Sequence, residues 1–537
     1  MGKPEVDYSL YLVTDSTPAI LGDRSIDAVV EAAVKGGVTI VQLREKEGDT
    51  GDLVAIGKRL HAICREYGVP LLINDRVDVA LAVGCEGVHI GQDDMDLATA
   101  RKLLGEDKII GVTVSTVEEA LIACEGGAHY LGIGTVYATP TKTNTKEIIG
   151  AAGVQNILEK IAAAGYDTQT VCIGGVNASN LQRIFFQCHA PSKALDGVAI
   201  VSAIMAAADP ESASRNLLHL IISPPPFLVD MKGQGAPKPS AQSQVELAPS
   251  VIKMVHETTP LSHNMTNLVV QNFAANVALA VGASPIMAGY GEEAPDLCKL
   301  GGALVINMGS VDPSGLENYL KALKAYNLAG RPVVYDPVGY VSNLEPREPK
   351  ADHDSAGATT LRRQAVKTIL SNGYLDVIKG NEGEIKTVFG GSQEQQRGVD
   401  SSSTLEPSQK IQLVRALAAR EKNVVVMTGK TDYVSDGTDT FAISNGHEYL
   451  GLVTGTGCTL GTAISAAIAA RKMDRMGAVI AAILHFEIAA ELAAARPEVR
   501  GPGTFLPAFL DELYQIRLAT ANGDCSWLGR AKVSSVE

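Results

Sequence analysis

The N-terminal part of the chain alternates short apolar runs with amphipathic, alanine-rich segments. A Gly, Asp or Asn turn follows each apolar run, which is typical of strands that lead into helices. The runs predict eight strands, at Ser9–Val13, Thr39–Leu43, Leu71–Ile73, Gly87–Ile90, Ile109–Val114, Tyr130–Ile133, Thr170–Ile173 and Gly197–Ile200. An open doubly wound sheet alternates in the same way, so it is the number of strands that favours a closed parallel (β/α)8 TIM barrel.

The same alternation resumes in the second part of the chain, after a segment without it. Residues 223–249 are rich in Pro, Ser, Gly and Gln and show no helical or strand period, which predicts a linker between domains at 1–222 and 250–537. Apolar residues at three- and four-residue spacing predict a helix over Asn264–Val281 and a largely helical tail over Gly457–Leu518. Strands are predicted between them, at Ala303–Asn307, Pro332–Asp336, Asp376–Lys379 and Asn423–Thr428. The pattern predicts a second α/β domain with a mainly parallel sheet.

Composition narrows the classes of partner. The 537 residues include 46 Lys and Arg against 60 Asp and Glu, a net charge of −14. This balance argues against a nucleic-acid or anionic-membrane surface, so any phosphate must be bound at a local site. Eight cysteines without a C-x-x-C pair, and an N-terminus without a basic-then-apolar signal region, lead us to expect a cytoplasmic protein. Charged residues interrupt the apolar stretches, so no membrane span is expected.

Polar residues gather where the predicted barrel strands end. Gln42, Arg44 and Lys46 alternate along one strand, so their side chains share a side and suit a pyrophosphate, although a solvated strand end explains them equally well. Asn74-Asp75 and Asp93-Asp94 follow two further strands and suit Mg²⁺, although an isolated Asp is more often a helix N-cap.

Later βα loops of the barrel carry the ingredients of a phosphate pocket. Thr139-Pro140-Thr141-Lys142 and Gly174-Gly175 offer hydroxyls, a cation and glycine amides. Val201 and Ser202 open the last helix, where N-terminal amides can hold a second phosphate.

These motifs, QLREK, ND, GQDD, TPTK, IGG and VSAI in this order, resemble thiamine-phosphate synthase over nearly all of residues 8–222. The resemblance implies a barrel that joins hydroxymethylpyrimidine diphosphate to thiazole phosphate and releases pyrophosphate. It assigns the diphosphate to Gln42, Arg44, Lys46, Asn74, Lys142 and Thr113, and Mg²⁺ to Asp75 and Asp94. It assigns the thiazole phosphate to Thr139, Thr141, Gly175, Val201 and Ser202. The family's GVS reads Gly111-Val112-Thr113 here, so either Thr113 or Ser115 supplies the hydroxyl.

In the second half, Gly455-Thr456-Gly457-Cys458-Thr459 precedes an alanine-rich helix. Glycine amides at a helix N-terminus form an anion hole for a phosphoryl group, and their field is expected to lower the pKa of the Cys458 thiol. A tight turn around a small buried cysteine is the alternative. Asp336 and Glu384 follow predicted strands and could organise Mg²⁺ and ATP, whereas no P-loop or protein-kinase glycine signature is present.

The motifs MTNLVVQNFAANVALAVGASPIM, INMGS, YDPVG, KGNEGEI, VVVMTGKTDYVSDG and GTGCTLG resemble hydroxyethylthiazole kinase, a ribokinase-like enzyme, over about residues 250–516. The resemblance assigns Met287 and Gly455 to the thiazole substrate, Lys379 and Thr428 to ATP, and Asp336 and Glu384 to Mg²⁺. It makes Cys458 the base, or the group that orients the substrate hydroxyl. Lys379 stands where the family commonly has Arg, and Cys458 stands where ribokinase relatives usually have Asp.

Together the two resemblances imply a bifunctional enzyme of thiamine biosynthesis, in which ATP is the kinase co-substrate and Mg²⁺ the cofactor. They also imply a homo-oligomer with the kinase sites between subunits. Two alternatives remain open at this stage. One half could be a degenerate sensor of thiamine intermediates, or the C-terminal half could phosphorylate a different small alcohol.

Overall fold

The computed structural model describes residues 6–45, 48–137, 139, 148–228, 239–309, 313–338, 360–390 and 405–537. The chain divides into two compact units, Met1–Pro225 and Pro226–Glu537. Each unit has its own hydrophobic cores.

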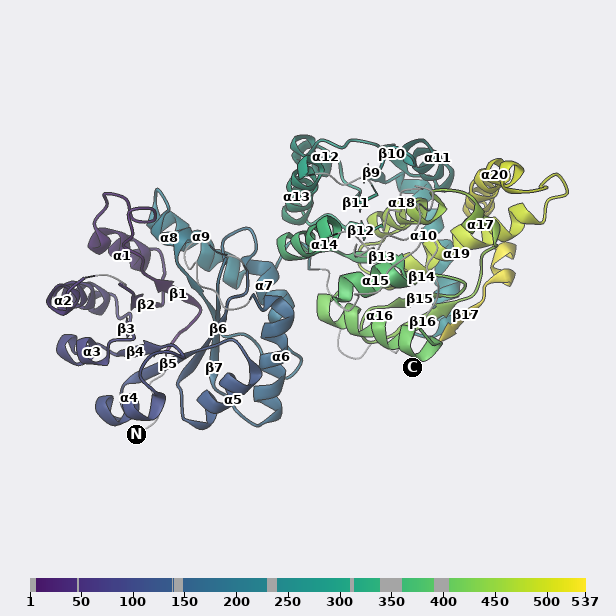
Figure 1. Cartoon of the computed structure of the whole chain (residues 1–537). Coiled ribbons are helices and arrows are strands. Elements are labelled where there is room, and N and C mark those ends of the chain that lie inside the picture. The colour runs from purple at the N-terminus through teal and green to yellow at the C-terminus, as the bar shows by residue number, and fades with distance from the viewer. Residues whose placement is uncertain are drawn as a thin grey trace, which may run out of the picture. The chain divides into compact units, whose positions relative to one another are not determined.

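The first unit is a closed barrel of eight parallel strands, in the order β1 to β8 with β8 paired to β1 (Figure 1). This confirms the predicted TIM barrel. Its strands are β1 (Leu10–Val13), β2 (Ile40–Leu43), β3 (Leu71–Asn74), β4 (Gly87–Ile90), β5 (Ile109–Val114), β6 (Tyr130–Gly134), β7 (Gln169–Ile173) and β8 (Gly197–Ile200). Its helices are α1 (Ile26–Lys35), α2 (Thr50–Glu66), α3 (Val77–Val83), α4 (Leu97–Leu104), α5 (Val117–Glu125), α6 (Gly150–Ala163), α7 (Leu181–Cys188), α8 (Ser202–Met205) and α9 (Pro210–Ile222).

The two-residue period of a strand separates two cores in this unit. Tyr11 and Val13 belong to a small core inside the barrel, whereas Leu10 and Leu12 of the same strand pack with the surrounding helices. Gly111 leaves room for the largest interior side chain, since a Cβ there would lie 2.0 Å from the ring of Tyr130. The barrel is therefore a packed interior, and its chemistry is confined to the ends of the strands.

The second unit contains a nine-stranded sheet in the order β10-β9-β11-β12-β13-β14-β15-β16-β17. Strands β9 to β14 run parallel to one another, and β15, β16 and β17 continue the sheet, each antiparallel to its neighbours. The strands are β9 (Leu261–Met265), β10 (Ser284–Ile286), β11 (Ala303–Asn307), β12 (Val333–Asp336), β13 (Val377–Asn381), β14 (Val424–Thr428), β15 (Asp432–Ser435), β16 (Thr440–Ile443) and β17 (Val533–Ser535). The mainly parallel sheet was predicted, but β9, β10 and the last three strands were not.

The predicted helix over Asn264–Val281 is wrong at its start. Asn264 and Met265 belong to β9, and the helix begins at Gln271. Three polar residues, Ser262, His263 and Asn264, make β9 hard to predict as a buried strand from the sequence. In the structure each of them has a hydrogen-bond partner in the core. Ser262 Oγ lies 2.6 Å from Ser465 Oγ, His263 Nδ1 lies 3.1 Å from the Tyr326 hydroxyl, and Thr462 donates to Asn264 Oδ1 at 2.8 Å.

Helices cover both faces of this sheet (Figure 1). The first layer contains α10 (Ala241–Thr258), α11 (Gln271–Val281), α18 (Thr456–Ala470), α19 (Arg475–Ala494) and α20 (Pro502–Ala521). The other contains α12 (Ala294–Leu297), α13 (Pro313–Leu328), α14 (Thr360–Asn372), α15 (Glu382–Phe389) and α16 (Pro407–Glu421), and the short helix α17 (Tyr449–Leu452) packs against the first layer. Helix α19 is apolar and long enough to cross a membrane, but 89% of its most apolar stretch is buried in the protein, where it forms the centre of the first layer.

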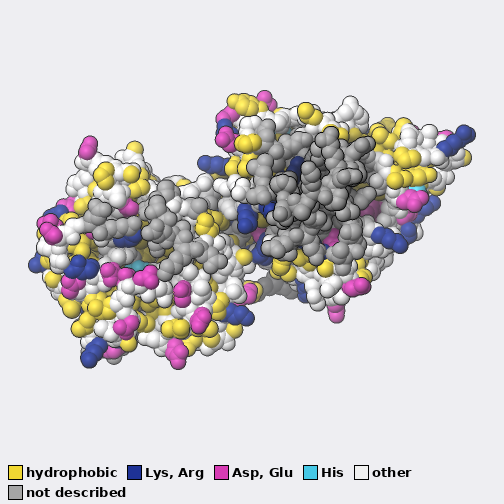
Figure 2. All heavy atoms as spheres, in the orientation of Figure 1, with side chains coloured by type: hydrophobic (Ala, Val, Ile, Leu, Met, Phe, Trp, Pro, Cys, Tyr) yellow, Lys and Arg dark blue, Asp and Glu magenta, His cyan; other side chains and the backbone are white. Residues whose placement is uncertain are grey.

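Surface charge is mixed. On the face shown in Figure 2, Lys and Arg side chains are scattered among Asp and Glu over the described surface of both units. This distribution agrees with the expectation that anionic ligands are bound at local sites.

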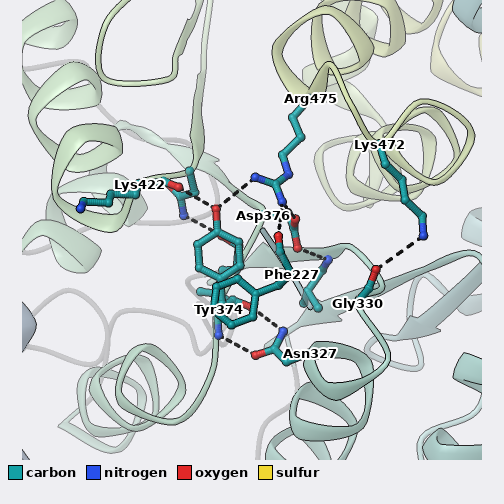
Figure 3. Close-up of polar contacts among 11 residues, drawn as sticks. Phe227, Asn327, Gly330, Tyr374, Asp376, Lys422, Lys472 and Arg475 are labelled. Carbon is teal, nitrogen blue, oxygen red and sulfur yellow. Dashed lines mark hydrogen bonds and ion pairs between the residues drawn. The ribbon is translucent and has the colours of Figure 1, made fainter. Parts of the chain in front are cut away.

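The segment predicted as a linker is structured at both ends. Its last residues form the first turns of α10, which begins at Ala241. At its start, Phe227 stacks on Tyr374 with the ring centroids 4.7 Å apart, and its carbonyl oxygen accepts a hydrogen bond from Arg475 at 2.8 Å (Figure 3). Arg475 in turn forms a buried ion pair with Asp376 at 2.7 Å. The linker prediction was therefore too long at both ends, because composition cannot show which apolar residue of a Pro-rich segment is buried. We call the site formed by Tyr374, Asp376 and Arg475 the Phe227 socket.

The Phe227 socket lies at the amino edge of the sheet. Asp376 directly precedes β13, and its second oxygen accepts the Val333 amide of β12 at 2.8 Å. Tyr374 donates its hydroxyl to the Lys422 carbonyl oxygen at 2.6 Å (Figure 3). The segment after Pro225 is thus fixed to the second unit at the edge opposite to the carboxyl ends of the strands.

We expect Phe227→Ala to lower the free energy of unfolding of the second unit by about 3 kcal/mol, since it removes a buried aromatic ring. The neighbouring Leu228, which is 39% exposed, is the matched control, and Leu228→Ala is expected to cost less than about 1 kcal/mol. Urea unfolding followed by the fluorescence of Trp527 measures both, since this only tryptophan of the chain lies buried in the second unit. Equal effects of the two substitutions would contradict the anchoring role of Phe227.

Candidate active sites

A chain of buried hydrogen bonds crosses the interior of the barrel. Gln42, at the end of β2, donates its amide to the Tyr11 hydroxyl at 2.7 Å, and that hydroxyl lies 2.7 Å from the Tyr130 hydroxyl. His89 joins Tyr130 through Nδ1 at 2.7 Å and Thr113 through Nε2 at 2.8 Å. The chain therefore connects two predicted diphosphate residues, Gln42 and Thr113, across the barrel.

The two tyrosines act as neutral groups in this chain. Burial raises the pKa of Tyr11 and Tyr130 far above its usual value, so both phenols stay protonated at neutral pH. The positions of the Gln42 amide and the Thr113 hydroxyl are fixed by this network rather than by solvent. Ser115, the alternative to Thr113, donates its hydroxyl to the Gly134 carbonyl oxygen at 2.8 Å.

Asp75 and Asp94, the predicted magnesium ligands of the first unit, lie within electrostatic reach of one another. Partial burial, followed by the negative charge of Asp94, raises the pKa of Asp75. Asp75 has a left-handed backbone with φ of 64°, and its amide donates to the His89 carbonyl oxygen at 2.8 Å. Asp94 accepts the Gly91 amide at 2.6 Å. Two carboxylates that repel each other suit a hard divalent cation, which neutralises both.

The predicted phosphate-binding positions are described only in part. The asparagine side chains of Asn177 and Asn180 donate to the Gly175 carbonyl oxygen at 3.1 and 2.9 Å, which fixes the loop after β7. Val201 is the N-cap of α8, and Ser202 is its first residue. Asn74 is the last residue of β3. Arg44 directly follows β2, and its backbone amide donates to the Thr14 hydroxyl at 2.9 Å. Lys46, Thr141 and Lys142 lie outside the described residues, and Thr139 is described without its neighbours.

The second unit gathers its candidate residues around one buried carboxylate, Asp336, at the end of β12. Its Oδ2 accepts hydrogen bonds from Lys379 Nζ and from the Asn307 amide, both at 3.0 Å. Burial raises the pKa of Asp336 to about 6, although the charge of Lys379 lowers it. Burial alone would lower the pKa of Lys379, but Asp336 and Glu384 outweigh it and raise that pKa.

Cys458 lies beside this cluster, in the first turn of α18. Its thiol is hydrogen-bonded to Asn307, and the charges of Asp336, Lys379 and Glu384 all act on it. Asn307 is itself held by the Asn267 amide, which donates to its Oδ1 at 3.1 Å. The fold thus brings Cys458, Asp336 and Lys379 together from three separate segments.

The expectation that the helix field lowers the pKa of Cys458 is wrong. Burial, and after it the negative charge of Asp336, raises the thiol pKa to about 12. The stabilising effects of Lys379 and Asn307 are smaller than these two. The thiol is therefore protonated at neutral pH, since desolvation of a thiolate outweighs the dipole of a single helix end.

The start of α18 offers an open space for an anion. Gly455, the N-cap, has a φ of +94°, and a Cβ there would lie 2.6 Å from Val270. At Gly457 the nearest atom to an added Cβ is Lys379 Nζ, at 4.0 Å. A free helix N-terminus that faces a lysine ammonium is a favourable place for a phosphoryl group.

The remaining predicted kinase residues lie in α15, at the end of β14 and just after β10. Glu384 forms a capping box at the start of α15, accepting the Asn381 amide at 2.7 Å. Thr428, the last residue of β14, pairs with Asn381 of β13. Met287 directly follows β10, at the far side of β9 from the cluster.

Several site residues were not assigned individually from the sequence. Asn267, Asn307, Tyr11, His89 and Tyr130 connect the predicted residues to one another. Asn267 and Asn307 stand inside quoted motifs, whereas Tyr11, His89 and Tyr130 do not. Their partners come from distant segments, so a linear motif could mark them but could not assign their contacts.

The fold and the two sites are those of a pair of small-molecule transferases in one chain, one in the barrel and one in the α/β unit. Residues 10–204 match the sequence model described as thiamine monophosphate synthase, and residues 252–519 match that of the hydroxyethylthiazole kinase family. The "Probable thiamine biosynthetic bifunctional enzyme" of Schizosaccharomyces pombe is 42% identical over 541 residues, covering 100% of both chains.

A second relative, the "Thiamine biosynthetic bifunctional enzyme" of Saccharomyces cerevisiae, is 37% identical and covers 96% of both chains. The "Hydroxyethylthiazole kinase" of Moorella thermoacetica is 42% identical over 264 residues, covering 49% of this chain and 90% of its own. The chain belongs to the family of bifunctional thiamine biosynthetic enzymes, with the synthase domain first and the kinase domain second.

Because burial keeps Cys458 protonated, we expect its alkylation by iodoacetamide at neutral pH to be at least about 100-fold slower in the native protein than in urea. The rate is expected to rise only as the pH approaches about 12. Mass spectrometry of the peptide that contains Cys458 measures the reaction, and the same peptide in urea is the control. Equal rates in the two states would show that the thiol is not shielded.

Proposed function

We propose that the kinase domain phosphorylates the thiazole alcohol with ATP, and that the synthase domain joins the resulting thiazole phosphate to hydroxymethylpyrimidine diphosphate. The single observation that carries the kinase assignment is the convergence of Asp336, Lys379 and Cys458 at the open N-terminus of α18. For the synthase it is the pairing of Asp75 with Asp94 beside the Gln42–Thr113 network.

In the kinase site, the Lys379 ammonium and the first amides of α18 stabilise the negative charge on the phosphoryl group that is transferred. The chemistry of phosphoryl transfer depends more on positioning and charge than on a strong base. A protonated thiol at Cys458 therefore orients the substrate hydroxyl, and the high thiol pKa argues against a thiolate base. Thr428 binds ATP, and Met287 and Gly455 shape the thiazole pocket.

A magnesium ion fits the kinase site. Asp336 Oδ1 is fully buried and has no hydrogen-bond partner among the described residues, so one carboxylate oxygen remains for a cation. Asp336 and Glu384 would hold Mg²⁺, which would neutralise the phosphates of ATP.

In the synthase site, Arg44, Lys46, Lys142, Asn74, Gln42 and Thr113 hold the pyrimidine diphosphate. Asp75 and Asp94 would hold Mg²⁺, which would make pyrophosphate a better leaving group. The C–O bond to the pyrimidine methylene breaks, pyrophosphate takes the electron pair, and the thiazole nitrogen forms the new C–N bond. Thr139, Thr141, Gly175, Val201 and Ser202 hold the thiazole phosphate in reach of this carbon.

The kinase domain is proposed to function as a homo-oligomer with its sites between subunits. Leu268 and Val269 are 81% and 72% exposed, and they directly follow Asn267, which is buried in the site. Two neighbouring apolar side chains exposed beside an active site favour burial against a second copy. The chain is further proposed to work in the cytoplasm, in keeping with the burial of α19 inside the protein.

One coupled assay tests the two activities together. With thiazole alcohol, ATP, Mg²⁺ and pyrimidine diphosphate supplied, we expect thiamine phosphate. Asp75→Ala should lower synthase activity at least about 100-fold and leave kinase activity within about twofold, whereas Cys458→Ala should do the reverse, with a loss of about 10-fold or more. The exposed Asp107, replaced by Ala, is the control. Loss of both activities in either variant would refute independent sites.

For the oligomer, we expect Leu268→Asp with Val269→Asp to yield a smaller species in sedimentation velocity and to lower kinase activity without lowering synthase activity. The control is Leu328→Asp, since Leu328 is 60% exposed but ends α13, away from the site. Unchanged sedimentation of the double variant would remove this surface from the proposed interface.

A further inference from the structure

Two carboxyl groups outside the predicted sites lie buried against one another in the second unit. Asp432, the first residue of β15, is 2% exposed, and Glu487, from the middle of α19, is 7% exposed. Their side chains are hydrogen-bonded to each other. Two buried carboxyl groups that are hydrogen-bonded to each other need a shared proton, because two buried negative charges would repel strongly.

The proton belongs to Glu487. Burial, and then the charge of Asp432, raises the pKa of Glu487 well above its usual value, whereas burial raises that of Asp432 only to about 6. Asp432 also accepts the Gly429 amide at 2.9 Å, which favours its ionised form. Glu487 Oε2 is buried, and no donor reaches it from the described residues. At neutral pH, Glu487 is thus a neutral donor and Asp432 a carboxylate that accepts from both sides.

Charged groups surround the pair on several sides. Glu491, one turn further along α19, forms ion pairs with Lys532 at 2.9 Å and with Arg530 at 3.8 Å. Lys379 of β13 acts on Asp432 through its charge, and Glu491 and Lys532 act in opposite directions on Glu487. His447 follows Gly446, which lies near the Glu487 carboxyl, and its Nδ1 accepts the Tyr449 amide.

The pair is connected to the proposed nucleotide site through the turn between β14 and β15. Thr428 ends β14, Gly429 opens the turn, and Asp432 closes it by binding the Gly429 amide. Asp432 is also within charge reach of Lys379, the cation of the phosphoryl site. Movement of the Asp432 side chain would therefore alter the backbone that directly follows Thr428.

We propose that the Asp432–Glu487 carboxyl pair positions the Thr428–Gly429 turn for the adenine nucleotide of the kinase reaction. Glu487 holds Asp432 from the helix layer, and Asp432 holds the turn. Both are positioning residues, since neither is assigned a contact with substrate. This inference rests on the proposed role of Thr428 in binding ATP.

The test compares ATP kinetics of full-length variants at saturating thiazole alcohol. Glu487→Met keeps the volume but removes the donor, and is expected to raise the KM for ATP about 3- to 10-fold with kcat within about twofold. Glu487→Gln keeps an N–H donor toward Asp432 and is expected to retain the wild-type KM within about twofold. The exposed Glu498, replaced by Gln, is the control, and thermal unfolding is followed for every variant.

The pH dependence adds a readout that a purely structural role would not change. As the pH rises through the raised pKa of Glu487, the wild-type pair loses its proton and the two carboxylates repel. The KM for ATP should then rise at alkaline pH in the wild type and stay flatter in Glu487→Gln. If Glu487→Met does not fold, this comparison alone decides, and identical profiles would overturn the proposal.

Thr428→Ala separates this inference from the function on which it rests. A raised KM for ATP in Thr428→Ala together with a wild-type KM in Glu487→Met would overturn the role of the pair and leave that of Thr428 intact. If Thr428→Ala has a wild-type KM, the ATP assignment of Thr428 fails. The inference rests on that assignment and then fails with it, whatever the KM of Glu487→Met. A fall in kcat and melting temperature without a change in KM would reduce the pair to a structural role.

Discussion

Parallel alignment of the strands is the constraint on which both sites depend. In a parallel sheet every strand ends at the same edge, so residues that follow different strands meet without a dedicated scaffold. The barrel gathers Gln42, Asn74 and Thr113 in this way. In the second unit, Asn307, Asp336 and Thr428 end β11, β12 and β14 and so lie along one edge. The opposite edge is left for structural contacts, such as the Phe227 socket.

Burial then decides the chemistry of each group at that edge. Asp336 and Lys379 form an ion pair that is almost fully withdrawn from water, and each keeps its charge because of the other. At Cys458, burial and the charge of Asp336 outweigh the effects of Lys379 and Asn307, so the same environment keeps the thiol protonated. Glu487 shows the same effect in the helix layer, where a neutral carboxyl costs less than a second buried charge. The kinase domain thus uses one buried cation, Lys379, to organise several acidic groups, which suits a site that must receive a polyanion.

Much of the fold could be predicted from the sequence. All eight barrel strands and four of the parallel strands in the second unit were found where apolar runs predicted them, because these strands are buried on both faces. Strand β9 was missed because its polar residues, Ser262, His263 and Asn264, have partners only in the folded core. Strand β17 was missed because its residues become a strand only by pairing with β16.

The sequence by itself determined the two domain types and marked candidate residues for their chemistry, since a motif is a local property of the chain and the ends of buried strands can be predicted from it. Only the tertiary structure decided how those residues behave. Cys458 lies at a helix N-terminus, as its motif predicts, yet its thiol pKa is raised rather than lowered because Asp336 and the surrounding core outweigh the helix end. Phe227, within a segment of linker composition, packs on Tyr374. Burial and partners depend on segments hundreds of residues away, as in the contact of Phe227 with Arg475, and no local pattern records them.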